Sequence, residues 1–169
     1  MTTLAHDRTR ASLASTPRLA GAARPESYAA SLPTAARLNA ALAILRVIAG
    51  TVFLAHGAQK VFVFGFAGVA GAFGGMGVPL PGLAGPAVAL LELLGGLALI
   101  AGLFTRLAAL GLAVTMLGAI VLVHLAAGFF LPNGVEFALI LFGAAAALAL
   151  TGPGAFSLDA VLARLRARG

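Results

Sequence analysis

The sequence predicts an all-α membrane protein: an antiparallel bundle of four transmembrane helices with both termini in the cytoplasm. Of its 169 residues, 61% are hydrophobic and only 9% are charged, whereas soluble domains carry about 25% charged residues. Too few polar side chains remain to cover a globule, so the composition excludes an ordinary soluble domain. The chain has no cysteine, which excludes disulfides, thiol catalysis and cysteine-ligated metal clusters.

Residues 1–37 predict a flexible cytoplasmic tail. They are rich in Ala, Ser, Thr, Pro and Arg and lack the apolar periodicity of a helix. The tail is too long and too polar to be the n-region of a cleaved secretory signal. The apolar segment that follows is therefore expected to remain in the protein as a signal anchor.

Four apolar stretches follow that are long enough to cross a membrane. A helix needs about 17–25 residues to cross a hydrocarbon core of ~30 Å. They cover approximately residues 38–61, 83–103, 107–127 and 135–151. Residues 62–82 contain several phenylalanines and then a run of Gly and Pro, which predicts an interfacial loop with one short helix around 67–73. Tight turns are expected at 103–106 and around Pro132-Asn133-Gly134.

The arginines predict the orientation, because cytoplasmic loops carry an excess of basic residues. With four spans, one side holds Arg8, Arg10, Arg18, Arg24, Arg37, Arg106, Arg164, Arg166 and Arg168. The opposite side has Lys60 at the edge of the first span. Anionic lipid on the inner leaflet of the membrane accounts for the net charge of +6, so nucleic acid is not an expected partner.

Residues 152–169 predict a cytoplasmic amphipathic tail. Ser157 is a suitable N-cap, and Asp159 lies in the first helical turn. The apolar side chains from Phe156 to Leu165 fall on one face, opposite the arginines, so we expect this helix to lie on the membrane surface. Docking of a soluble partner is the alternative.

Two charged residues fall deep inside the predicted spans, and a charged residue at a helix centre costs about 2.5–3.5 kcal/mol. Arg46 lies ~12 Å and Glu92 ~16 Å from the cytoplasmic ends of their helices. An arginine side chain can bridge that difference, so an Arg46–Glu92 ion pair is the first predicted contact.

Glycines accompany these charged residues on the helical wheel. Gly85, Gly95, Gly96 and Gly102 lie near Glu92, and Gly50 and Gly57 share a face with Arg46 and Lys60. Such small residues let neighbouring membrane helices approach closely. The charged faces are therefore expected to be the packed faces.

A second polar group is predicted near the outer surface. It consists of His56, Gln59, Lys60, His124 and Glu136, which three different helices contribute. With Glu92 below them, they could line a pocket that opens to the outside. The catalytic candidates are His56, Glu92, His124 and Glu136, and the ligand-binding candidates are Arg46, Gln59 and Lys60.

Structural roles compete with these functional ones. Arg46 and Glu92 could simply fix the helix register, and the outer residues could snorkel and anchor loops. His56 and His124 could ligate haem or another metal. Because no further ligand is evident and Lys60 would be a cationic neighbour, no metal site is predicted.

Several short motifs resemble the DoxX family of small bacterial membrane proteins. They are Arg46, His56-Gly57-Ala58-Gln59-Lys60, Glu92 before Gly95-Gly96, Thr105-Arg106, His124 with Gly128-Phe129-Phe130, Asn133-Gly134 with Glu136, and Thr151-Gly152-Pro153-Gly154 with Ser157-Leu158-Asp159. The resemblance runs from about Leu42 to Leu162. It implies a part in membrane redox metabolism, such as quinone-linked oxidation of thiosulfate or a response to oxidative or thiol stress.

Two function classes remain open from the sequence. In the first, the chain is a component of a membrane oxidoreductase system that uses quinone, with a soluble partner supplying electrons or substrate. In the second, it is a membrane scaffold or a small-solute or proton-coupled transporter. Membrane lipid is an expected partner in both, and a second copy of the chain is a further candidate.

Overall fold

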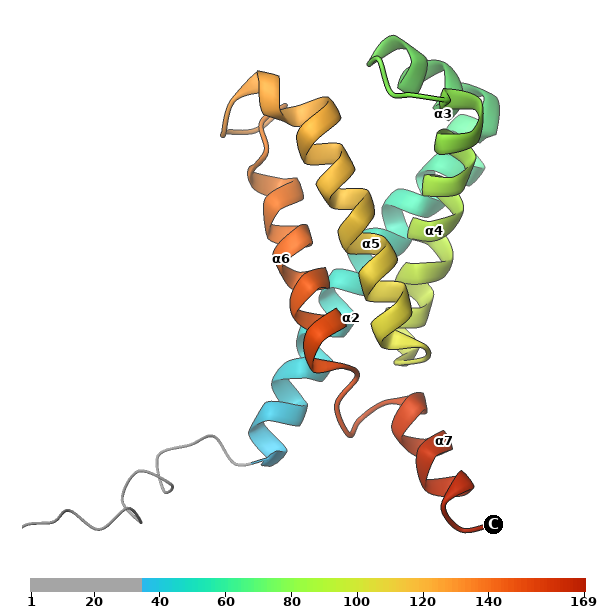
Figure 1. Ribbon diagram of the computed structural model, residues 1–169, viewed down its shortest axis with the longest axis vertical. Helices are drawn as coiled ribbons and strands as arrows, with labels where there is room; N and C mark the ends of the chain where they lie inside the picture. The colour runs from blue at the N-terminus through green and yellow to red at the C-terminus, as the bar shows by residue number, and fades with distance from the viewer. Residues whose placement is uncertain (1–34) are drawn as a thin grey trace, which may run out of the picture. The chain divides into compact units, whose positions relative to one another are not determined.

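The computed structural model describes residues 35–169, and all its regular elements in that range are helices (Figure 1). The predicted tail lies outside the described residues as far as Thr34. The helices are α2 (Ala35–Ala58), α3 (Gly65–Gly75), α4 (Pro81–Ala101), α5 (Thr105–Ala119), α6 (Glu136–Thr151) and α7 (Leu158–Arg166). Two π-helical turns, Gln59–Phe64 and Ile120–His124, extend α2 and α5, and a 3-10 turn, Leu125–Ala127, follows the second.

Three helical segments are long and apolar enough to cross a membrane: residues 35–75, 81–101 and 105–127. α6 is also apolar but has only 16 residues. The all-helical class predicted from composition is therefore confirmed for the described residues. The four-span count and the cytoplasmic position of both termini stay predictions.

The segment 62–82 is mostly helix, so the expectation of a long loop there was wrong. The short helix expected around 67–73 is present but wider, as α3, and only residues 76–80 connect it to α4. α3 packs on α4: Val69 is buried, and a Cβ added to Gly85 would lie 3.0 Å from the Ala70 backbone nitrogen. This tertiary packing outweighs the low helix propensity of the glycines.

Glycines bring the α2 and α4 backbones into direct contact, as the sequence predicted. A Cβ on Gly57 would lie 2.2 Å from the Leu93 nitrogen, and one on Gly96 would lie 2.4 Å from the Leu54 nitrogen. Gly50 faces Gly96 and Ile100 in the same way. The two helices therefore run antiparallel, with their register fixed by positions that have no side chain.

The helices form two arms that diverge from the short α4–α5 turn, Gly102–Phe104. α3 and α4 make one arm and α5 and α6 the other, while α2 passes behind both (Figure 1). We call the end with this turn the hairpin end, and the end with α3 and loop 128–135 the open end. The arms share one apolar core, which includes Phe53, Leu99, Leu112, Leu141 and Leu148.

Hydrogen bonds from the C-terminal segment close the hairpin end. The Asp159 carboxylate accepts the backbone N–H groups of Phe104 (2.9 Å) and Thr105 (3.0 Å), which start α5 and lack partners within the helix. The Asp159 N–H donates to the Gly102 carbonyl (2.9 Å). Ser157 Oγ accepts the Ala160 N–H (3.2 Å), so the predicted N-cap of α7 is confirmed.

We predict that Gly57→Ala destabilises the protein by about 1–3 kcal/mol, the usual cost of overpacking a core. The new methyl group would meet the α4 backbone, which cannot rotate out of the way as a side chain can. Thermal unfolding in detergent, followed by circular dichroism, measures the effect.

Gly143→Ala is the matched control, because a Cβ on Gly143 has no neighbour within 4 Å. In a helix interior, alanine is more favourable than glycine by up to about 1 kcal/mol. The control is therefore expected to melt at the same temperature as the wild type or higher. Equal melting temperatures for the two variants would contradict the close α2–α4 contact.

Candidate functional site

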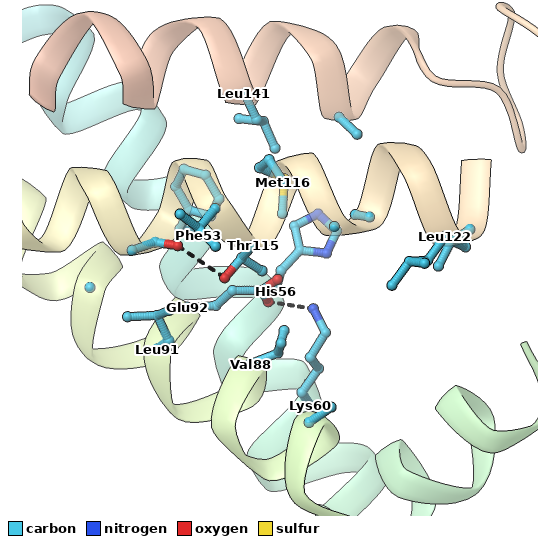
Figure 2. Close-up of a pocket in the computed structure, with 18 of the residues that line it drawn as sticks. Phe53, His56, Lys60, Val88, Leu91, Glu92, Thr115, Met116, Leu122 and Leu141 are labelled. Atoms are coloured by element: carbon cyan, nitrogen blue, oxygen red, sulfur yellow. Dashed lines mark hydrogen bonds and ion pairs between the residues drawn. The ribbon is translucent and has the colours of Figure 1, made fainter. Parts of the chain in front are cut away.

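A cavity of about 1210 Å³ lies between the two arms (Figure 2). α4 and α5 form its walls, α2 forms its floor, and α6 and the end of α3 close its sides. The lining is apolar except for a few side chains. These are His56 and Lys60 from α2 and its π turn, Glu92 from α4, Thr115 from α5 and His124 from the second π turn.

The floor is one face of the first helix. Phe53, His56 and Lys60 are spaced three and four residues apart, so they lie above one another along the helix. Phe53 is 1% exposed and seals the bottom of the cavity. The His56 ring packs against Phe137 of α6, with the ring centroids 5.8 Å apart.

Lys60 of the floor and Glu92 of the α4 wall form an ion pair. The Lys60 Nζ donates to Glu92 Oε2. The Glu92 side chain is 4% exposed and that of Lys60 19%. Gly57 makes this contact possible, because it lets the α2 backbone lie directly against Glu92 and Leu93. Figure 2 shows the pair next to His56 at one side of the cavity.

The predicted Arg46–Glu92 ion pair is wrong. Arg46 is buried, but its Nη1 donates to the Pro153 carbonyl (2.7 Å) and its Nη2 to the Phe156 carbonyl (2.6 Å). The α2–α4 register places Arg46 beside Gly102, where a Cβ would lie 2.5 Å from Nη1. Glu92 is ten residues from Gly102, or ~15 Å along the helix, which is too far for an arginine side chain.

The outer polar residues do not gather into one cluster. His124 lines the cavity near its open end, and its Nδ1 lies 2.7 Å from the Asn133 carbonyl. Glu136 does not line the cavity, and its carboxylate accepts the Leu131 N–H (2.7 Å) within the adjacent loop. Gln59 is exposed and borders a separate hollow of about 260 Å³ with Ala55 and His56.

Two polar residues have positions near the site that the sequence did not reveal. Thr115 lines the cavity, although its hydroxyl donates to the Gly111 carbonyl (3.1 Å) of its own helix. Asp159 was assigned to the start of its own helix, α7, whereas it caps α5, which forms a cavity wall. Thr115 is a polar residue within the apolar stretch 107–127, and that contrast could have identified it. The role of Asp159 depends on a contact that no local pattern encodes.

The arrangement places a few hydrogen-bonding groups in an otherwise apolar space. Lys60 has three N–H bonds and Glu92 accepts one of them. His56 offers an imidazole that can donate or accept a proton. Among residues 35–169, no three His, Cys, Asp or Glu side chains are grouped so as to hold a metal ion. The site therefore suits an apolar molecule that carries hydrogen-bond acceptors.

We predict strong coupling between Lys60 and Glu92. Lys60→Met leaves the buried Glu92 carboxylate without its cation, which typically costs about 3–5 kcal/mol. The double variant Lys60→Met, Glu92→Leu removes both charges and is expected to recover most of that loss. Unfolding free energies in detergent for the four proteins of the cycle give the coupling. Additive losses would show that the two groups do not form a pair.

Comparison with known proteins assigns this chain to a family. The DoxX family model matches residues 41–125, half of the chain, from α2 to the first residue of the 3-10 turn. A Bacillus subtilis protein named "Putative oxidoreductase CatD" is 38% identical over 116 residues, which cover 69% of this chain and 82% of that protein. An "Uncharacterized protein" of Haemophilus influenzae is 36% identical over 122 residues, covering 70% and 87% of the two chains.

No solved structure matches the chain significantly.

The segment that the family model matches includes every ionisable residue that lines the cavity, namely His56, Lys60, Glu92 and His124. The motifs noted in the sequence and the family match thus agree, and the chain belongs to the DoxX family of membrane proteins.

Proposed function

We propose that this protein binds the headgroup of a quinone in the cavity between its two arms, as a component of a membrane oxidoreductase system. The observation that carries the proposal is the Lys60–Glu92 pair, which lies with His56 in the lining of an otherwise apolar cavity. The name of the Bacillus subtilis relative, an oxidoreductase, supports a redox role.

The chemistry of a quinone suits this lining. Its ring is flat and apolar, and its two carbonyl oxygens accept hydrogen bonds. Phe53 and Phe137 supply aromatic surface, and the ammonium of Lys60 and the imidazole of His56 supply donors. Ligand pockets commonly measure about 300–1,000 Å³, so a cavity of about 1210 Å³ has room for the ring and part of a side chain.

In the proposed reaction, the chain holds the quinone and supplies protons. Reduction of a quinone to a quinol takes up two electrons and two protons and forms two O–H bonds. The electrons come from a soluble redox protein, and the protons pass through His56 and the Lys60–Glu92 pair, the acid–base groups that lie together in the cavity. Glu92 also holds the ammonium of Lys60 in place for the quinone oxygen.

The proposal includes an orientation in the bacterial inner membrane. Arg37 near the start of α2, Arg106 at the start of α5 and the arginines of α7 belong to the hairpin end, whereas Lys60 lies in the π turn that leads into α3 at the open end. Basic residues favour the cytoplasmic side, so the hairpin end faces the cytoplasm and the soluble partner docks there. α6 then forms a fourth span of ~24 Å, slightly shorter than the hydrocarbon core of about 30 Å.

We predict that Lys60→Met weakens quinone binding about 10- to 150-fold, because a hydrogen bond to a charged group contributes about 1.5–3 kcal/mol. Purified protein in lipid nanodiscs is titrated with decylubiquinone, and His56→Ala is tested in the same way. Thr51→Val is the control, since Thr51 is exposed on α2 and bonds only to Val47 of its own helix.

The control is expected to bind decylubiquinone as the wild type does. Absence of quinone binding by the wild-type protein, together with absence of quinol formation with candidate electron donors, would overturn the proposal. The scaffold or transporter alternative would then stand.

A further inference from the structure

His56 borders two hollows. It lines the cavity together with Phe53 and Lys60, and it also lines the separate hollow of about 260 Å³ with Ala55 and Gln59. A helix turns about 100° per residue, so Phe53 and Lys60 lie within about 60° of His56 on one side. Gln59 and Ala55 lie about 60° and 100° from it on the other side. The imidazole therefore lies at the border between the cavity and this second hollow, which we call the outer hollow.

The outer hollow lies where the first helical segment leaves the hydrocarbon core. Arg37, near the start of α2, is a basic residue that favours the membrane interface. His56 is nineteen residues farther along the helix, or ~28 Å, and a hydrocarbon core is ~30 Å thick. Ala55, His56 and Gln59 are all exposed. At this depth, an exposed imidazole and an exposed amide meet the water of the opposite interface, which is the one at the open end.

Of the acid–base groups at the headgroup site, His56 is the one that is exposed. The Glu92 side chain is 4% exposed and that of Lys60 19%, and the two bond to each other. Phe137 of α6 packs on the His56 ring and carries no charge. His124, the other ionisable residue of the cavity lining, bonds to a backbone carbonyl of the adjacent loop. A proton that moves between bulk water and the headgroup site therefore has its shortest route through His56.

We infer that the outer hollow is a proton port, which holds water and connects His56 to the aqueous phase at the open end. The inference rests on the proposed quinone site and adds the route of its protons. As electrons arrive from the soluble redox protein, His56 gives its N–H proton to a quinone oxygen, and an O–H bond forms. The other ring nitrogen takes a proton from water in the outer hollow. Rotation of the exposed ring by half a turn then brings the new N–H to the cavity.

The first test measures whether water reaches the outer hollow, and from which end. The chain has no cysteine, so single cysteines can be introduced as Gln59→Cys and, as the lipid-facing control, Ile48→Cys. Ile48 is 61% exposed and lies on the same face of α2 as Gln59, eleven residues or ~16 Å deeper in the membrane. Gly169→Cys, after α7, marks the hairpin end. Each variant in proteoliposomes is treated with MTSET, a cationic thiol reagent that does not cross membranes.

Gln59→Cys is expected to react at least about 10-fold faster than Ile48→Cys, because a thiol forms its reactive thiolate in water and not in lipid. MTSET should label it from the side opposite to Gly169→Cys. Equal reactivity of Gln59→Cys and Ile48→Cys, or labelling of Gln59→Cys from the hairpin side, would rule out the port. Ala55→Cys is the second variant, used if Gln59→Cys melts at a lower temperature than the wild type.

The second test measures whether that water reaches His56 itself. The C2–H of an imidazole exchanges with deuterium from heavy water, and mass spectrometry reads the exchange at each histidine. In protein saturated with decylubiquinone, the quinone covers the cavity side of His56, so exchange reports the outer hollow. The wild type and Thr51→Val are expected to keep exchanging, whereas Gln59→Leu, which makes the outer hollow apolar, should lose most of the exchange. Loss of exchange in the quinone-bound wild type would show that His56 meets water only through the cavity.

The two proposals fail in different ways. If the wild type does not bind decylubiquinone, the quinone site itself is wrong, and the MTSET experiment alone decides whether the outer hollow holds water. If the wild type binds decylubiquinone and Gln59→Cys is no more reactive than Ile48→Cys, the quinone site stands and the port is wrong.

Discussion

The buried carboxylate of Glu92 is the constraint on which the arrangement depends. An uncompensated charge inside an apolar helix bundle costs several kcal/mol, so it needs a cation at hydrogen-bonding distance. Lys60 supplies that cation, and it can do so only because Gly57 brings the α2 backbone against α4. Close glycine packing, helix register and the ion pair are therefore one feature of the structure, and replacing Gly57 would disturb all three.

The two ends of the molecule are held in different ways, which explains where the cavity opens. At the hairpin end, polar contacts join residues far apart in sequence: Arg46 bonds to Pro153 and Phe156, and Asp159 bonds to the start of α5. At the open end, the bond between His124 and Asn133 spans nine residues, and the bond between Glu136 and Leu131 spans five. These local bonds shape one loop but do not tie the two arms together, so the arms are free to diverge there.

The sequence was sufficient for the features that depend on composition and local pattern. Membrane character, the apolar segments, the glycine faces and the Ser157 cap all follow from residue type and spacing. Pairing of charges was not predictable in the same way. The depths of Arg46 and Glu92, counted from the estimated ends of their helices, placed the two side chains opposite each other. The register fixed by Gly50 and Gly57 places Arg46 opposite Gly102 instead. Register depends on which backbones touch, and a single sequence does not show that.

The π-helical turn after α2 accommodates the close contacts between the first helical segment and α4. Gly57 of α2 faces Leu93, and Ala70 of α3 faces Gly85. The chain advances thirteen residues from Gly57 to Ala70, whereas α4 covers the same interval with eight residues. The surplus of five residues is taken up by the π turn at Gln59–Phe64 and by the bend at Gly65, whose φ of 67° and ψ of 164° essentially only glycine adopts. Lys60 lies in this widened stretch, and the second π turn carries His124 on the opposite wall. Such turns are frequent at functional sites. The two irregular stretches therefore border the cavity at the point where the regular packing of the arms ends.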